Sequence, residues 1–164
     1  MLKLGGFLAV ALMLGCGGAK TKDGPPAGRA WKDMDHDQRT AFMKDTVLPE
    51  MKAMFVAFSA DYAEMDCKTC HGAGAEDGSF EMPNADIWVL PSEAGWKRFV
   101  PDAEETKWLE FMGGKVKPAM AKLLGTSDYN WETGQGDFNC SGCHATSTDD
   151  ATLVPTSAPT LDTP

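Results

Sequence analysis

Two five-residue segments contain four of the five cysteines in this 164-residue chain. They are Cys67-Lys68-Thr69-Cys70-His71 and Cys140-Ser141-Gly142-Cys143-His144, and both have the form Cys-x-x-Cys-His. Two thiols at this spacing can form thioether bonds to the vinyl groups of one porphyrin, and the histidine that follows can bind the iron. The segments therefore predict two covalent haem c groups on Cys67, Cys70, Cys140 and Cys143, with His71 and His144 as proximal ligands.

The sixth ligand of each iron has to come from elsewhere in the chain. With only three histidines, bis-histidine ligation of both irons is excluded, whereas the ten methionines offer the usual alternative. Met51 and Met120 are favoured because they occupy equivalent positions on two apolar helix faces. The alternatives are that both methionines fill the core, or that the matched pair Met43 and Met112 supplies the ligands.

An internal repeat is expected to position these ligands. Five positions recur 69 residues apart, and the cysteines of the two motifs recur 73 apart. The repeated residues pair as Phe42 with Phe111, Met43 with Met112, Val47 with Val116, Pro49 with Pro118, and Met51 with Met120. Apolar residues at i, i+4 and i+8 predict an amphipathic helix in each copy. We therefore expect an all-α domain over residues 31–145, built from two helix-then-haem units at about 34–92 and 101–145.

Local signals mark the boundaries of the predicted helices. Asp35 and Asp102 are candidate N-caps, each followed three residues later by Gln or Glu, and Gly125 is a candidate C-terminal stop. Pro49 and Pro118 fall inside the helices, where a proline removes one hydrogen bond and kinks the axis. We interpret the shared kink as a means of directing the methionine two residues later. Residues 72–101 read as a long irregular loop, with a short strand compatible with residues 87–90.

The two ends of the chain read as segments outside the folded domain. Residues 1–15 carry Lys3 and a short apolar run, as a secretory signal peptide does. Residues 16–30 read as a flexible tether, and residues 146–164, rich in Thr, Ser, Pro and Asp, as a disordered tail. The run Leu12-Met13-Leu14-Gly15-Cys16 resembles a lipobox of bacterial lipoproteins. That resemblance implies lipidation of Cys16 and anchoring to the periplasmic side of a bacterial membrane.

Charge narrows the range of partners. The formal net charge is −9 for the whole chain, and removal of Lys3 with the signal peptide would make it −10. Phosphates would repel such a protein, so nucleic acid is not an expected partner. A redox protein with a basic docking face is the partner we expect.

The two motifs make the chain similar to dihaem c-type cytochromes. A helix that bears the distal methionine upstream of each motif also resembles the repeat of the tetrahaem cytochrome subunit of photosynthetic reaction centres. These resemblances imply electron transfer by two haems with histidine and methionine ligands rather than catalysis. The alternative is a haem enzyme of peroxidase-like type, or a gas sensor, with one open distal site.

Overall fold

The computed structural model describes residues 30–148. The predicted signal peptide, the tether up to residue 29 with the lipidation candidate Cys16, and the tail from residue 149 lie outside the described residues. Within them, no helix is both long and apolar enough to cross a membrane.

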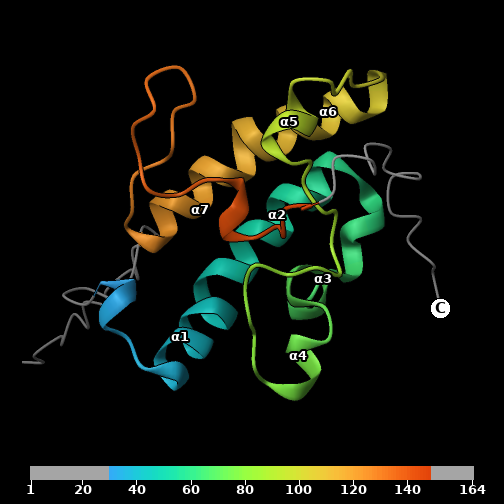
Figure 1. Ribbon diagram of the computed structural model, residues 1–164. Coiled ribbons are helices and arrows are strands. Elements are labelled where there is room, and N and C mark those ends of the chain that lie inside the picture. The colour runs from blue at the N-terminus through green and yellow to red at the C-terminus, as the bar shows by residue number, and fades with distance from the viewer. Residues whose placement is uncertain (1–29, 149–164) are drawn as a thin grey trace, which may run out of the picture.

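Two long helical segments form the framework, one in each repeat (Figure 1). The first comprises α1 (His36–Phe42), the π-helical turn η2 (Met43–Val47) and α2 (Leu48–Phe58). The second comprises α6 (Ala103–Phe111), the π-helical turn η4 (Met112–Val116) and α7 (Lys117–Leu124). The two π-helical turns are 69 residues apart, as the sequence repeat is, so the repeated residues adopt the same local structure.

Both predicted helix starts are confirmed, and so is the predicted stop. Asp35 forms a capping box with Gln38, and Asp102 forms one with Glu105. In each box the aspartate accepts a hydrogen bond from the backbone of the third helical residue, whose side chain accepts one from the cap. Gly125 ends α7 in the left-handed conformation, with φ 68° and ψ 34°.

The prolines follow a widened turn in each helical segment. Leu48 N–H bonds to the Met43 carbonyl, and Lys117 N–H bonds to the Met112 carbonyl, so each bond spans five residues. Pro49 and Pro118 come next, near the start of α2 and α7. A proline ring in a regular helix clashes with the carbonyl four residues earlier, and a π turn displaces that carbonyl. Each proline is thus accommodated by a local π turn within a continuing helical segment.

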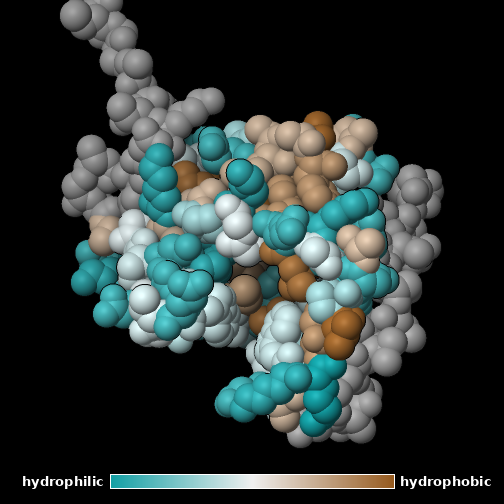
Figure 2. Space-filling model, turned by 90° about the horizontal axis from the view of Figure 1, so that it is seen from above, coloured by the Kyte–Doolittle hydropathy of each residue, from teal (hydrophilic) through white to brown (hydrophobic). Residues whose placement is uncertain are grey.

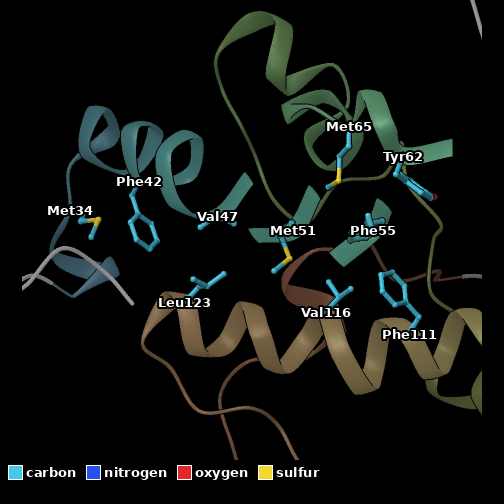
Figure 3. Close-up of a cluster of buried hydrophobic side chains, with 10 residues drawn as sticks. All are labelled: Met34, Phe42, Val47, Met51, Phe55, Tyr62, Met65, Phe111, Val116 and Leu123. Carbon is cyan, nitrogen blue, oxygen red and sulfur yellow. The ribbon is translucent and has the colours of Figure 1, made fainter. Parts of the chain in front are cut away.

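The two helical segments pack antiparallel, and the main hydrophobic core lies between them (Figure 3). Leu123, from the end of the second segment, lies beneath Val47 of the first, while Phe111 lies beneath Phe55. The Phe55 and Phe111 rings meet edge to face at 5.0 Å between centroids. The apolar stripe predicted from the sequence is therefore the buried face of each segment.

The remaining described elements are short. They are η1 (Trp31–Asp33), η3 (Ala60–Glu64), α3 (Cys67–His71), α4 (Gly74–Asp77), α5 (Glu93–Trp96) and η5 (Cys140–Gly142). Helices make up 58% of the described residues and no strand occurs among them, which confirms the all-α prediction. The strand considered for residues 87–90 does not form. Only isolated bridges occur there, such as that between Leu90 and Thr146.

Two residues after position 145, the predicted end of the domain, are paired with the rest of the fold. Ser147 N–H donates to the Leu90 carbonyl at 2.8 Å, and Thr146 forms the bridge with the same residue. Residues 146 and 147 thus extend the pairing that begins at the second Cys-x-x-Cys-His motif.

The Asp102 cap gives a first test of the fold. Asp102→Ala removes the acceptor for the Glu104 and Glu105 backbone N–H groups. We expect it to lower the free energy of unfolding by about 1 kcal/mol, as the loss of an N-cap does. Asp102→Asn keeps an acceptor, so it should lower the free energy of unfolding by only about a few tenths of a kcal/mol. Equal losses in the two variants, measured by urea unfolding, would show that the cap is not the source of the effect.

Candidate haem-binding site

The first motif forms the short helix α3. Asp66 caps this helix by accepting from Lys68 N–H at 2.8 Å, and its own N–H donates to the Thr69 hydroxyl at 3.2 Å. The helix thus begins at Cys67, and Cys70 follows three residues later. Residues three apart lie on the same face of a helix, so both thiols face in similar directions.

The second motif forms a tighter turn, η5. The Asn139 side chain accepts from Ser141 N–H at 2.9 Å and so caps the start of the turn. The His144 N–H bonds to the Cys140 carbonyl at 3.0 Å, which holds the histidine directly after the turn. An aspartate or asparagine cap before the first cysteine is therefore common to both motifs.

The ring of His144 is oriented by a backbone carbonyl. Its Nδ1 lies 2.7 Å from the carbonyl oxygen of Trp88. Because a carbonyl only accepts, Nδ1 must carry the hydrogen of this bond, and Nε2 takes no part in it. A histidine that ligates a metal through one nitrogen usually donates from the other in this way. The geometry of His144 therefore fits a proximal iron ligand.

His71 has a different environment. Its Nδ1 is buried and forms no hydrogen bond among the described residues. Burial lowers the pKa of the His71 imidazole, and the backbone of Phe80 opposes that shift in part. The Phe80 ring stands edge-on to the imidazole at 5.4 Å between centroids. Burial thus favours the neutral ring, which is the form that binds a metal.

The four motif cysteines are free thiols that lie partly buried. Burial raises the pKa of Cys70 to about 12, and Cys143 contributes to the same shift. Burial likewise raises the pKa of Cys143 to about 11. Cys70 and Cys143, the second cysteines of the two motifs, are thus close enough to interact electrostatically, although they are 73 residues apart in the sequence.

One segment, residues 84–90, is hydrogen-bonded to both motifs. Asn84 Nδ2 donates to the Cys70 carbonyl at 3.0 Å, and Asn84 N–H donates to the Cys143 carbonyl at 2.9 Å. Leu90 N–H donates to the Ala145 carbonyl at 2.8 Å. We call residues 84–90 the linking segment, because it joins the two motifs.

The proposed distal ligands lie in the helical core. Met51 on α2 is only 4% exposed and faces the second helical segment, between Val116 and Leu123 (Figure 3). Met120 on α7 is half-buried and packs against the same core, as does Cys70 of the first motif. The structure thus brings the two methionines and one motif cysteine to a single hydrophobic cluster.

A buried lysine lies beside the second motif. Lys117 is 9% exposed, and its Nζ donates to Asp128 Oδ1 at 2.5 Å and to the Tyr129 carbonyl at 2.6 Å. Burial raises the pKa of Cys140, and the Lys117 ammonium opposes that shift. The positive charge therefore acts at the sulfur of the second motif. The equivalent position of the first repeat, 69 residues earlier, is the apolar Leu48.

The surface beside the first motif is hollowed. A cavity of about 270 Å³ opens beside His71 and is bordered by Asn84 and Asp86. Figure 2 shows a recess near the middle of one face of the molecule, with hydrophobic residues at its edge. Among residues 30–148, no group of three or more His, Cys, Asp or Glu side chains is arranged to hold a bare metal ion.

The two cysteines and the histidine of each motif are side chains that fit haem c. Two free thiols lie three residues apart, an imidazole follows, and the His144 imidazole bonds to the Trp88 carbonyl through Nδ1, which leaves Nε2 outside that bond. Comparisons with protein-family models, curated proteins and solved structures found no match to this chain.

Several residues of the site could not be identified from the motifs. They are Asn84, Asp86 and Trp88 of the linking segment, with Gly72 and Lys117. Lys117 could have been noticed in the sequence, because a lysine stands where the first copy of the repeat has the apolar Leu48. The role of Trp88 could not have been noticed, since only its backbone carbonyl takes part.

Proposed function

We propose that the chain is a small electron-transfer protein with two covalent haem c groups, exported and anchored to the periplasmic side of a bacterial membrane through Cys16. The proposal places the haems on the cysteines of the two motifs, with His71 and His144 as proximal ligands and Met51 and Met120 as distal ligands. It is a carrier rather than an enzyme.

One observation supports this proposal most strongly. The two motifs, far apart in the sequence, are joined by hydrogen bonds from one residue, Asn84, in a domain of about 120 described residues. Two prosthetic groups fastened there would lie near each other. Electron transfer between them and with a partner would then need little movement of the chain.

Haem supplies the one-electron chemistry, and the residues of the chain control it. Methionine as a sixth ligand would raise the reduction potential, and the Nδ1–H bond of His144 to Trp88 would strengthen the imidazole as a donor. The acidic surface, with a net charge of −9 for the whole chain, suits brief docking to a redox partner with a basic face.

Two measurements test the proposal, a potentiometric titration of the protein and the addition of carbon monoxide to its reduced form. The full chain, matured in cells that attach haem c, should undergo two reversible one-electron steps. Its reduced spectrum should not change with carbon monoxide, because both irons have six protein and porphyrin ligands. Binding of carbon monoxide to native protein would instead favour the haem enzyme or gas sensor with an open distal site.

Lys117 should raise the potential of one haem. A haem bonded to Cys140 would feel the ammonium that acts on this sulfur. Lys117→Met removes that charge and leaves Asp128, so we expect one of the two potentials to fall by roughly 40 mV, about 1 kcal/mol. The measurement is a redox titration that follows both steps.

Asp128→Asn is the matched control for this prediction. It leaves the Lys117 charge less compensated, so the same potential should rise rather than fall. A shift of equal sign in both variants would mean that altered packing, not charge, moves the potential.

A further inference from the structure

The polar groups of Asn84 are all engaged. Its Nδ2 and its N–H donate to the two motifs, and its Oδ1 accepts from Asp86 N–H at 2.8 Å. Its carbonyl accepts from Ala145 N–H at 3.4 Å. The residue is only 7% exposed, and a buried amide that loses its partners costs free energy. Asn84 is therefore held in one position.

The two carbonyls that Asn84 binds are equivalent. Cys70 and Cys143 are the second cysteines of their motifs, the residues directly before the proximal histidines. The side chain of Asn84 reaches the first carbonyl and its backbone reaches the second. One residue thus holds the same point of both motifs.

The linking segment is fastened to the two motifs by different means. Its bonds to the second motif use backbone groups of the segment, including the Trp88 carbonyl that accepts from His144. Its bonds to the first motif use side chains, namely Asn84 to Cys70 and Asp86 Oδ2 to Ala73 N–H at 3.2 Å. A substitution at Asn84 should therefore leave the first motif held to the segment by the Asp86 bond alone, while the backbone bonds to the second motif remain.

We infer that Asn84 is a positioning residue that fixes the distance and angle between the two haems and thereby sets the electronic coupling between them. The inference rests on the proposed function, since it requires a haem on each motif. It assigns to Asn84 no contact with either iron. Its effect is transmitted through the backbone of Cys70 and Cys143.

Circular dichroism in the Soret region reports the distance and angle between the two haems through the exciton coupling of their absorption bands. Two haems held close together give a paired positive and negative band, whose amplitude depends steeply on their separation and mutual angle. Asn84→Ala removes the whole amide. Asn84→Asp keeps the shape and the acceptor for Asp86 N–H but replaces the donor that reaches Cys70. Asn130→Ala is the control, because the Asn130 side chain caps an exposed loop by accepting from Glu132 and Thr133.

We expect both Asn84 variants of the full matured chain to retain two haems and to lose most of the paired band, while Asn130→Ala keeps it. An unchanged paired band in Asn84→Asp with two haems present would overturn the inference and leave the proposed function intact. A parent protein with two haems but no paired band would overturn it as well. A parent protein without haem would overturn the proposed function instead.

Discussion

Met51→Ala should lower the free energy of unfolding by about 2–5 kcal/mol, as the truncation of a large core side chain does. Met51 is among the most buried residues of the core and lies where the two helical segments meet. Urea unfolding of the full chain, followed by far-ultraviolet circular dichroism, measures the loss.

Met51→Leu separates packing from ligation. Leucine has nearly the same volume, so the variant should lose less than about 1.5 kcal/mol of stability. Leucine cannot bind iron, so under the proposed ligation one haem should lose its low-spin spectrum while the fold persists. Met120→Leu should do the same to the other haem. A Met51→Leu protein with both haems still low-spin would show that Met51 only fills the core.

Gly72→Ala should cost about 3 kcal/mol and should reduce haem attachment at the first motif. Gly72 follows His71 directly and has φ 52° and ψ −135°, a conformation that residues with a side chain rarely adopt. A Cβ atom there would lie 2.4 Å from Asp86 Oδ2 and 3.0 Å from Asn84 Nδ2. The alanine would therefore push the Asp86 and Asn84 side chains, which hold the linking segment to the first motif, out of their positions. Urea unfolding and the haem content of the purified protein measure the two effects.

Gly78→Ala is the matched control. Gly78 also has a positive φ, 79°, but a Cβ atom there would meet nothing within 4 Å. Only the backbone penalty of about 1–2 kcal/mol is expected, with haem content unchanged. Equal effects of the two substitutions would mean that contact with the linking segment is unimportant at Gly72.

The sequence was sufficient for features that depend on near neighbours. The capping boxes of Asp35 and Asp102 and the stop at Gly125 each involve a few consecutive residues, and all were predicted. The apolar stripes also predicted which helix faces would be buried. At the prolines the expectation was a kink after a lost hydrogen bond. The structure shows that a π turn precedes each proline, which the sequence pattern did not indicate.

The linking segment could not be predicted, because its contacts depend on the path of an irregular chain. Asn84 lies 14 residues from Cys70, and Trp88 lies 56 residues from His144. No periodicity or spacing relates such pairs. The unusual position of Lys117 could be predicted in part, since the second copy of the repeat has this charged residue where the first copy has Leu48. Its partner Asp128 lies in an irregular loop, whereas the first repeat has the short helix η3 between its long helical segment and its motif.

A haem count on the exported full-length protein tests the central claim most directly. Protein from cells that mature c-type cytochromes should contain two haems per chain that survive denaturation, with an intact mass raised by two haem groups. Paired replacement of Cys67 and Cys70, or of Cys140 and Cys143, by serine should leave one. A colourless protein, with its four motif thiols free or joined to one another as disulfides, would contradict the account.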